Sequence, residues 1–93
     1  MQVQENKSLE ELRKELKELL VDNLALEEIT PEEIKDDEIL FEEGLGLDSL
    51  DAVEIVVLIQ RNYGLEIVDE EEAREILRSM DTLARWVHEN SNK

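Results

Sequence analysis

Cysteine is absent from the sequence, and proline, glycine and aromatic residues are scarce, with one, three and three copies in 93 residues. Without cysteine, disulfide bridges and thiolate metal sites are both excluded. No apolar run approaches the roughly 20 residues that a membrane-spanning helix needs, and the N-terminus lacks the basic and then apolar segments of a signal peptide. We therefore expect a single-domain cytoplasmic protein without a membrane span, and by default a monomer.

Basic residues are also few, because 10 lysines and arginines face 26 acidic residues and the formal net charge is −16. A surface of this sign repels nucleic acid, whose binding depends on basic side chains that neutralise phosphates. It is steered instead toward basic patches on partner proteins, although the same charge could serve solubility alone. Disorder is not expected, because 41% of the residues are apolar and they recur at helical spacing.

The first helix is predicted over about residues 8–24. Ser8 and Glu11 have the spacing of a capping box, and leucines recur at intervals of three and four on one face. Arg13, Lys14 and Lys17 are expected on the solvated opposite face. Residues 25–47 form a long connection in which Pro31 begins a short helical turn. Six apolar residues should hold this connection against the helices: Ile34, Ile39, Leu40, Phe41, Leu45 and Leu47.

The second helix should begin after an Asp48 N-cap and end near Tyr63, before Gly64. It carries two apolar stripes. One comprises Ala52, Ile55, Val56, Ile59 and Tyr63, and the other comprises Leu50, Val53 and Val57. The first stripe is expected in the core, whereas the second is either buried against the long connection or exposed for binding.

Two further helices follow. A capping box at Asp69–Glu72 predicts a short third helix through about Leu77, and Ser79 caps a last helix over about residues 80–90. The predicted fold is all-α: a four-helix bundle with a short third helix and a long ordered connection between the first two helices. We expect the domain to span residues 8–90, between flexible termini at 1–7 and 91–93.

Conventional catalysis finds little support. His88, the single histidine, lies in the last predicted helical turn, where a cation suits the helix dipole. Ser49 is not a nucleophile elbow, because Leu47 and Asp51 stand where glycines are required. The acidic residues 36–38 do not begin a calcium-binding loop, because apolar residues occupy its fifth and sixth positions. No enzyme and no metal site is predicted, and by position alone Ser49 is an ordinary first-turn residue.

Residues Gly46–Asp51 read Gly-Leu-Asp-Ser-Leu-Asp, and this stretch resembles the phosphopantetheine attachment motif of acyl carrier proteins. The similarity continues through residues 50–56, which resemble the family's recognition helix, and through residues 63–67 at its exit. With the leucine-striped first helix and the long connection, the resemblance covers about residues 8–88.

This resemblance implies a non-enzymatic carrier of acyl groups. Ser49 would carry a covalent 4′-phosphopantetheine arm derived from coenzyme A, and Asp48 would be recognised by the phosphopantetheinyl transferase. Ser49 should be exposed at a junction that Gly44 and Gly46 loosen, where free amides of the helix N-terminus favour the phosphate. Acyl-transferring, ketosynthase and reductase-type enzymes with basic docking patches would bind a surface made of Leu50, Asp51, Val53, Glu54 and Val57.

The interior is rich in aliphatic residues, so we hypothesise that it could part to shelter an acyl chain. Gln60, Arg61 and Asn62 replace the acidic residues usual in carriers of fatty-acid synthesis. In this the chain looks more like stand-alone carriers of aryl-polyene or type II polyketide pathways. Two alternatives stay open: an aminoacyl or D-alanyl carrier, and an acidic helical interaction module without a prosthetic group.

Overall fold

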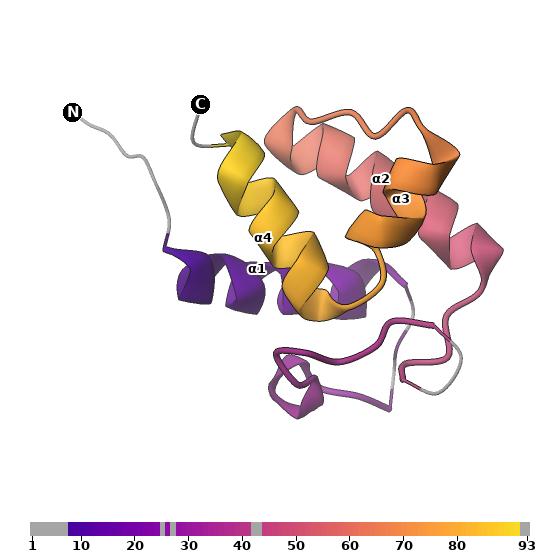
Figure 1. The fold of residues 1–93 in the computed structure, drawn as a ribbon. Coiled ribbons are helices and arrows are strands. Elements are labelled where there is room, and N and C mark those ends of the chain that lie inside the picture. Colours follow the sequence, from indigo (N-terminus) through magenta and orange to yellow (C-terminus); the bar gives the residue numbers. More distant parts are fainter. Residues whose placement is uncertain (1–7, 25, 27, 42–43, 92–93) are drawn as a thin grey trace.

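The computed structural model describes residues 8–24, 26, 28–41 and 44–91. Within these segments the chain forms four α-helices and one short 3-10 turn, joined by irregular segments with two isolated bridges and no strand. The helices are α1 (Leu9–Asn23), α2 (Ser49–Tyr63), α3 (Glu70–Ile76) and α4 (Met80–Ser91), and the turn is η1 (Pro31–Glu33). The all-α prediction with a short third helix is confirmed (Figure 1). Of the termini expected to be flexible, 1–7 and 91–93, residues 1–7 and 92–93 lie outside the described residues. Ser91 is the last residue of α4, so the helix extends one residue into the predicted C-terminal tail.

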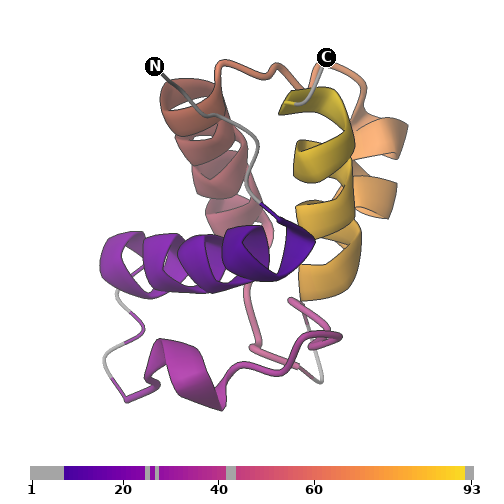
Figure 2. The same cartoon turned by 90° about the vertical axis from the view of Figure 1, so that its left-hand side faces the viewer.

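The helices surround one aliphatic core. Helix α1 crosses α2 and α4 steeply, and α2 and α4 stand side by side (Figure 2). Helix α3 packs against α4, while the connection between α1 and α2 runs past the ends of the bundle. Every helix contributes buried side chains, among them Leu16, Leu20, Ile55, Ile59, Ile76, Met80, Leu83 and Val87. Burial of this apolar surface is the main stabilising term.

The helix ends follow the local chemistry of the sequence. The Ser8 hydroxyl accepts a hydrogen bond from the Glu11 amide, and the Glu11 carboxylate accepts one from the Ser8 amide. Gly64 ends α2 with a positive φ of 68°, which a residue without Cβ adopts at least cost. Asp69 caps α3 by accepting from the Glu71 amide. The reciprocal bond predicted from Glu72 is not among the hydrogen bonds of the described residues, so Asp69 forms a simple cap.

The connection is ordered by burial and by backbone hydrogen bonds. Ile34, Leu40 and Leu47 are buried. The Met80 amide donates to the Glu38 carbonyl at 2.8 Å, and the Leu40 amide donates to Arg78 at 3.4 Å, which joins the connection to the start of α4. The prediction that Ile39 also anchors this segment is wrong, because 49% of its surface is exposed. Neighbouring residues of an extended segment point to opposite sides, so Leu40 enters the core and Ile39 faces outward.

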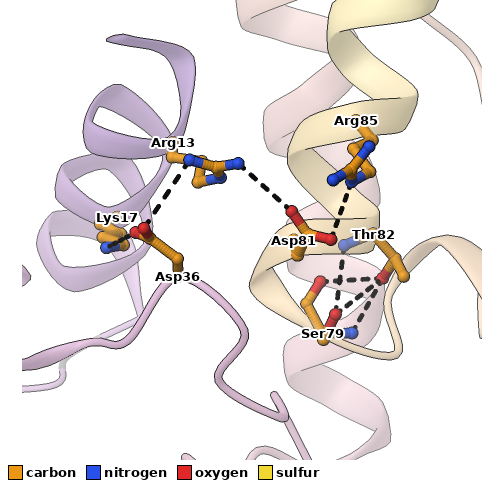
Figure 3. A network of polar contacts seen from close by, with 7 residues as sticks. All are labelled: Arg13, Lys17, Asp36, Ser79, Asp81, Thr82 and Arg85. Atoms are coloured by element: carbon orange, nitrogen blue, oxygen red, sulfur yellow. Dashed lines mark hydrogen bonds and ion pairs between the residues drawn. The ribbon is translucent and has the colours of Figure 1, made fainter. Parts of the chain in front are cut away.

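A network of charged side chains reinforces these contacts (Figure 3). Asp36 in the connection accepts a hydrogen bond from Lys17 at 2.7 Å and pairs with Arg13 at 3.7 Å. Arg13 also reaches Asp81 of α4 at 3.5 Å, and Asp81 pairs with Arg85 at 2.8 Å. The side chains of Arg13 and Lys17 are 19% and 14% exposed. The expectation that these two cations belong to an ordinary solvated face is therefore wrong.

The end of α2 is tied to α1 by a further polar contact. The Tyr63 hydroxyl donates to Glu15 at 2.6 Å, across 48 residues of sequence. Burial of the ring and the bond to Glu15 hold the pKa of Tyr63 well above its usual value, so the phenol keeps its proton and continues to donate.

The Asp36 network predicts a loss of stability in acid. The hydrogen bond from Lys17, and then the charges of Lys17 and Arg13, lower the pKa of Asp36 below its ordinary value of 3.8. The folded carboxyl is thus more acidic than the unfolded one. Its contribution is complete above pH 3.8 and disappears as the pH falls through the lower, folded pKa. Asp36→Asn should therefore lower the urea midpoint at neutral pH, and the difference from wild type should vanish in acid.

Asp37→Asn is the matched control, because Asp37 is exposed and its substitution removes the same charge without touching the network. Equal urea midpoints for the two variants at pH 7 would contradict the role assigned to Asp36.

Candidate functional site

Ser49 is the first residue of α2, and its side chain is exposed. The two aspartates beside it form a reciprocal cap. Asp48 Oδ1 accepts from the amides of Leu50 and Asp51 at 3.0 and 3.1 Å, and Asp51 Oδ2 accepts from the Asp48 amide at 3.0 Å. Both carboxylates therefore fix the start of the helix, and none of these three bonds involves the Ser49 hydroxyl. The Asp48 cap was predicted, whereas the return bond from Asp51 was missed although the spacing of three residues signals it.

The cap changes one expectation about the phosphate. Free amides at the helix start were expected to favour an anion, but Asp48 already occupies those of Leu50 and Asp51. The expectation that the helix start offers free amides to the phosphate is therefore wrong for the amides of Leu50 and Asp51.

The segment before Ser49 is held in place. The Leu47 side chain is buried, and its amide donates to the Leu40 carbonyl at 3.1 Å. The Leu45 amide donates to Ile39 at 2.9 Å. A Cβ added to Gly44 would lie 1.5 Å from the Ile39 carbonyl oxygen. Gly44 thus permits a close approach of two backbone segments. The sequence had predicted instead that Gly44 loosens the junction. Gly46 has a φ of 73° and turns the chain into Leu47.

Helix α2 presents its two apolar stripes to different surroundings. Ile55 and Ile59 are buried in the core, together with Leu58, which the sequence analysis left out of the stripe. On the other side Leu50, Val53 and Val57 are 77%, 62% and 38% exposed. We call these three residues the exposed stripe. The alternative that they are buried against the connection is excluded by these exposures.

Ser49 also lies at an apolar groove between α2 and α3. The groove has a volume of about 360 Å³. Its lining residues recur at three- and four-residue intervals on both helices, and Phe41 adds a ring from the connection: Phe41, Ser49, Ala52, Val53, Val56, Glu70, Ala73, Arg74 and Leu77. Its two charged residues, Arg74 and Glu70, form an exposed ion pair at 3.9 Å. Six of the nine lining residues are apolar, so the groove suits a hydrophobic ligand.

Several known proteins are similar to this chain in sequence. Residues 10–71 match the family described as "Phosphopantetheine attachment site". The acyl carrier protein of Wolinella succinogenes is 37% identical over 76 residues, which cover 82% of this chain and 92% of the relative. That of Campylobacter hominis is 32% identical over 83 residues, which cover 89% and 99%.

The chain belongs to the acyl carrier protein family. The family prediction is thereby confirmed. Such proteins are carriers and not enzymes, and they hold a covalently attached 4′-phosphopantetheine. The residues present are compatible with this group, because Ser49 offers an exposed hydroxyl and lies beside an apolar groove.

The other residues considered for chemistry do not line the groove. His88 lies in the last turn of α4, where a cation suits the dipole. Asp36 is engaged with Lys17 and Arg13. In the described part of the chain, no group of three or more histidines and carboxylates is arranged to hold a metal ion. The same residues include no helix with the length and hydrophobicity needed to span a membrane.

The close approach at Gly44 predicts that an added methyl group costs stability there through a clash, and at Gly64 only through backbone conformation. Gly44→Ala should destabilise the carrier by about 1–3 kcal/mol or more, because the added methyl group overlaps the Ile39 backbone. At Gly64 nothing lies within 4 Å of an added Cβ, so Gly64→Ala should cost only the left-handed conformation, about 1–2 kcal/mol. Urea unfolding measures both free energies. A Gly44→Ala variant as stable as wild type would show that the backbone approach is not required.

Proposed function

We propose that Ser49 carries the 4′-phosphopantetheine arm, whose terminal thiol holds an acyl group as a thioester for partner enzymes. The observation that carries this proposal is the exposed Ser49 side chain at the edge of the apolar groove. The reciprocal aspartate cap supports it, since it fixes the helix start on both sides of the serine.

Asp48 is the residue that we assign to recognition by the phosphopantetheinyl transferase. Both of its capping bonds use Oδ1. Oδ2 receives no hydrogen bond from the described residues, and the side chain is exposed. Asp48 can thus hold the helix start with one oxygen and offer the other to a basic group of the transferase.

The partner surface is the exposed stripe together with Asp51 and Glu54. Apolar contact with Leu50, Val53 and Val57 supplies affinity, and the carboxylates steer basic patches of the partner toward the helix. The partners that we propose are acyl-transferring, ketosynthase and reductase-type enzymes of fatty-acid or polyketide-type synthesis. Exposure of three aliphatic side chains on one helix face supports a binding role.

We further propose that the groove shelters the part of the acyl chain nearest the arm. Its apolar walls favour a hydrocarbon over the charged amine of an aminoacyl or D-alanyl group, because burial of an unpaired charge is costly. An interaction module without a prosthetic group would not need an accessible serine beside such a groove.

Attachment at Ser49 is tested by mass. The purified apo protein is incubated with coenzyme A, magnesium and a broad-specificity phosphopantetheinyl transferase, and the intact mass is measured. Wild type should gain one phosphopantetheine and Ser49→Ala none. Ser8→Ala is the matched control, because Ser8 is also an exposed serine at a helix start, and it should be modified like wild type. An unshifted wild type with several transferases would favour the interaction module.

Sheltering in the groove is tested by NMR of long-chain acyl and unacylated forms. Amide shifts should change at Ala52, Val56 and Ala73 of the groove and stay constant around Pro31–Glu33 on the far connection. Ala73→Leu should reduce these changes, because the larger side chain fills the groove. Identical shifts in the acyl and unacylated forms would exclude this role.

A further inference from the structure

Arg61 lies in line with the exposed stripe of α2. Helical residues four apart lie one above the other on the same face, and Arg61 follows Val57 by four positions. Its side chain is exposed, as are those of Val57 and Glu54. The face that begins with Leu50 therefore ends, three turns later, in a cation.

Arg61 has no partner within the described part of the chain. All five arginines lie there, and the other four each pair with a carboxylate. Its two neighbours turn back on the chain: Gln60 donates to Glu66 at 3.4 Å, and Asn62 donates to the Leu58 carbonyl at 2.9 Å. Arg61 alone among these three is free to meet another molecule.

We propose that Arg61 is part of the docking surface and that the partners of this carrier meet it with a carboxylate. This rests on the partner surface assigned above. Glu54 and Arg61 are seven residues apart, which is about 10 Å along the helix. The complementary surface of the partner is therefore basic opposite Asp51 and Glu54 and apolar opposite Val53 and Val57. It is acidic opposite Arg61, about one helical turn beyond Val57.

Such a surface selects among partners by repulsion as well as by attraction. A docking patch that is basic throughout would place a cation against Arg61, and like charges across an interface are unfavourable. A two-ended charge pattern also sets one direction of docking, because a reversed partner would meet like charge at both ends of the stripe.

The test uses the apo protein and a bacterial fatty-acid ketosynthase whose carrier-docking patch is basic throughout. Binding is measured by isothermal titration calorimetry at several KCl concentrations. Arg61→Glu should bind this ketosynthase about three- to tenfold more tightly than wild type, with Arg61→Gln between them. Arg78→Glu makes the same charge change at an exposed site of the α3–α4 junction and should alter the affinity by less than about twofold.

A second arm locates the contact. Single Lys→Glu and Arg→Glu variants of the ketosynthase patch are titrated with wild type and with Arg61→Glu. At least one reversal should strengthen binding to wild type and weaken binding to Arg61→Glu, which identifies the group opposite Arg61.

If Arg61→Glu and Arg78→Glu changed the affinity for the ketosynthase equally, the change would be explained by net charge alone, and the proposal would be overturned. Weaker binding by Arg61→Glu, or no binding by it, would also overturn the proposal, because removal of the cation should open the face to a basic patch. The apo protein separates this outcome from the Ser49 assignment, which the mass measurement decides independently.

Discussion

The position of Ser49 depends on the packing of Leu47 into the core two residues earlier. That side chain is buried and its amide is bonded to Leu40, so the chain reaches α2 from a fixed point. The reciprocal cap of Asp48 and Asp51 then sets the first turn. A hydroxyl placed between a buried anchor and a capped helix is accessible yet fixed in direction. This combination agrees with the proposed attachment of the arm at Ser49.

Helix α2 is apolar on two sides, of which one is buried in the core and the other is exposed. Ile55 and Ile59 are fully buried, and they fix the helix in the common core. The exposed stripe then stands on a helix that cannot rotate without disrupting the core. The groove arises where α2 faces α3, and Val53 borders both the groove and the exposed stripe. One 15-residue helix thus contributes to the core, to the exposed stripe and to the groove, which explains its high apolar content.

Local sequence predicted the helices well because their ends are encoded by nearby residues, such as Ser8 with Glu11 and Gly64 after Tyr63. Ser49 was selected through its motif, and its place at the helix start was predicted from the Asp48 cap. Features that depend on distant segments were missed. Lys17 donates to Asp36, 19 residues away, and the Tyr63 hydroxyl donates to Glu15, 48 residues away. No periodicity reveals such contacts, because they arise from the path of the connection.

Because basic residues are scarce in this chain, the position of each one is informative. The net charge is −16, so a basic residue on this surface differs from its surroundings, and we look for a nearby contact that explains it. Arg13 and Lys17 are accounted for by the contacts that hold the connection. Arg61 makes no such contact within the described residues. Its interaction with the helix dipole near the C-terminal end of α2 stabilises the fold by about 1 kcal/mol at most. A helix-end cation could lie on any face. Its place directly beyond Val57 on the exposed stripe is what favours an intermolecular role.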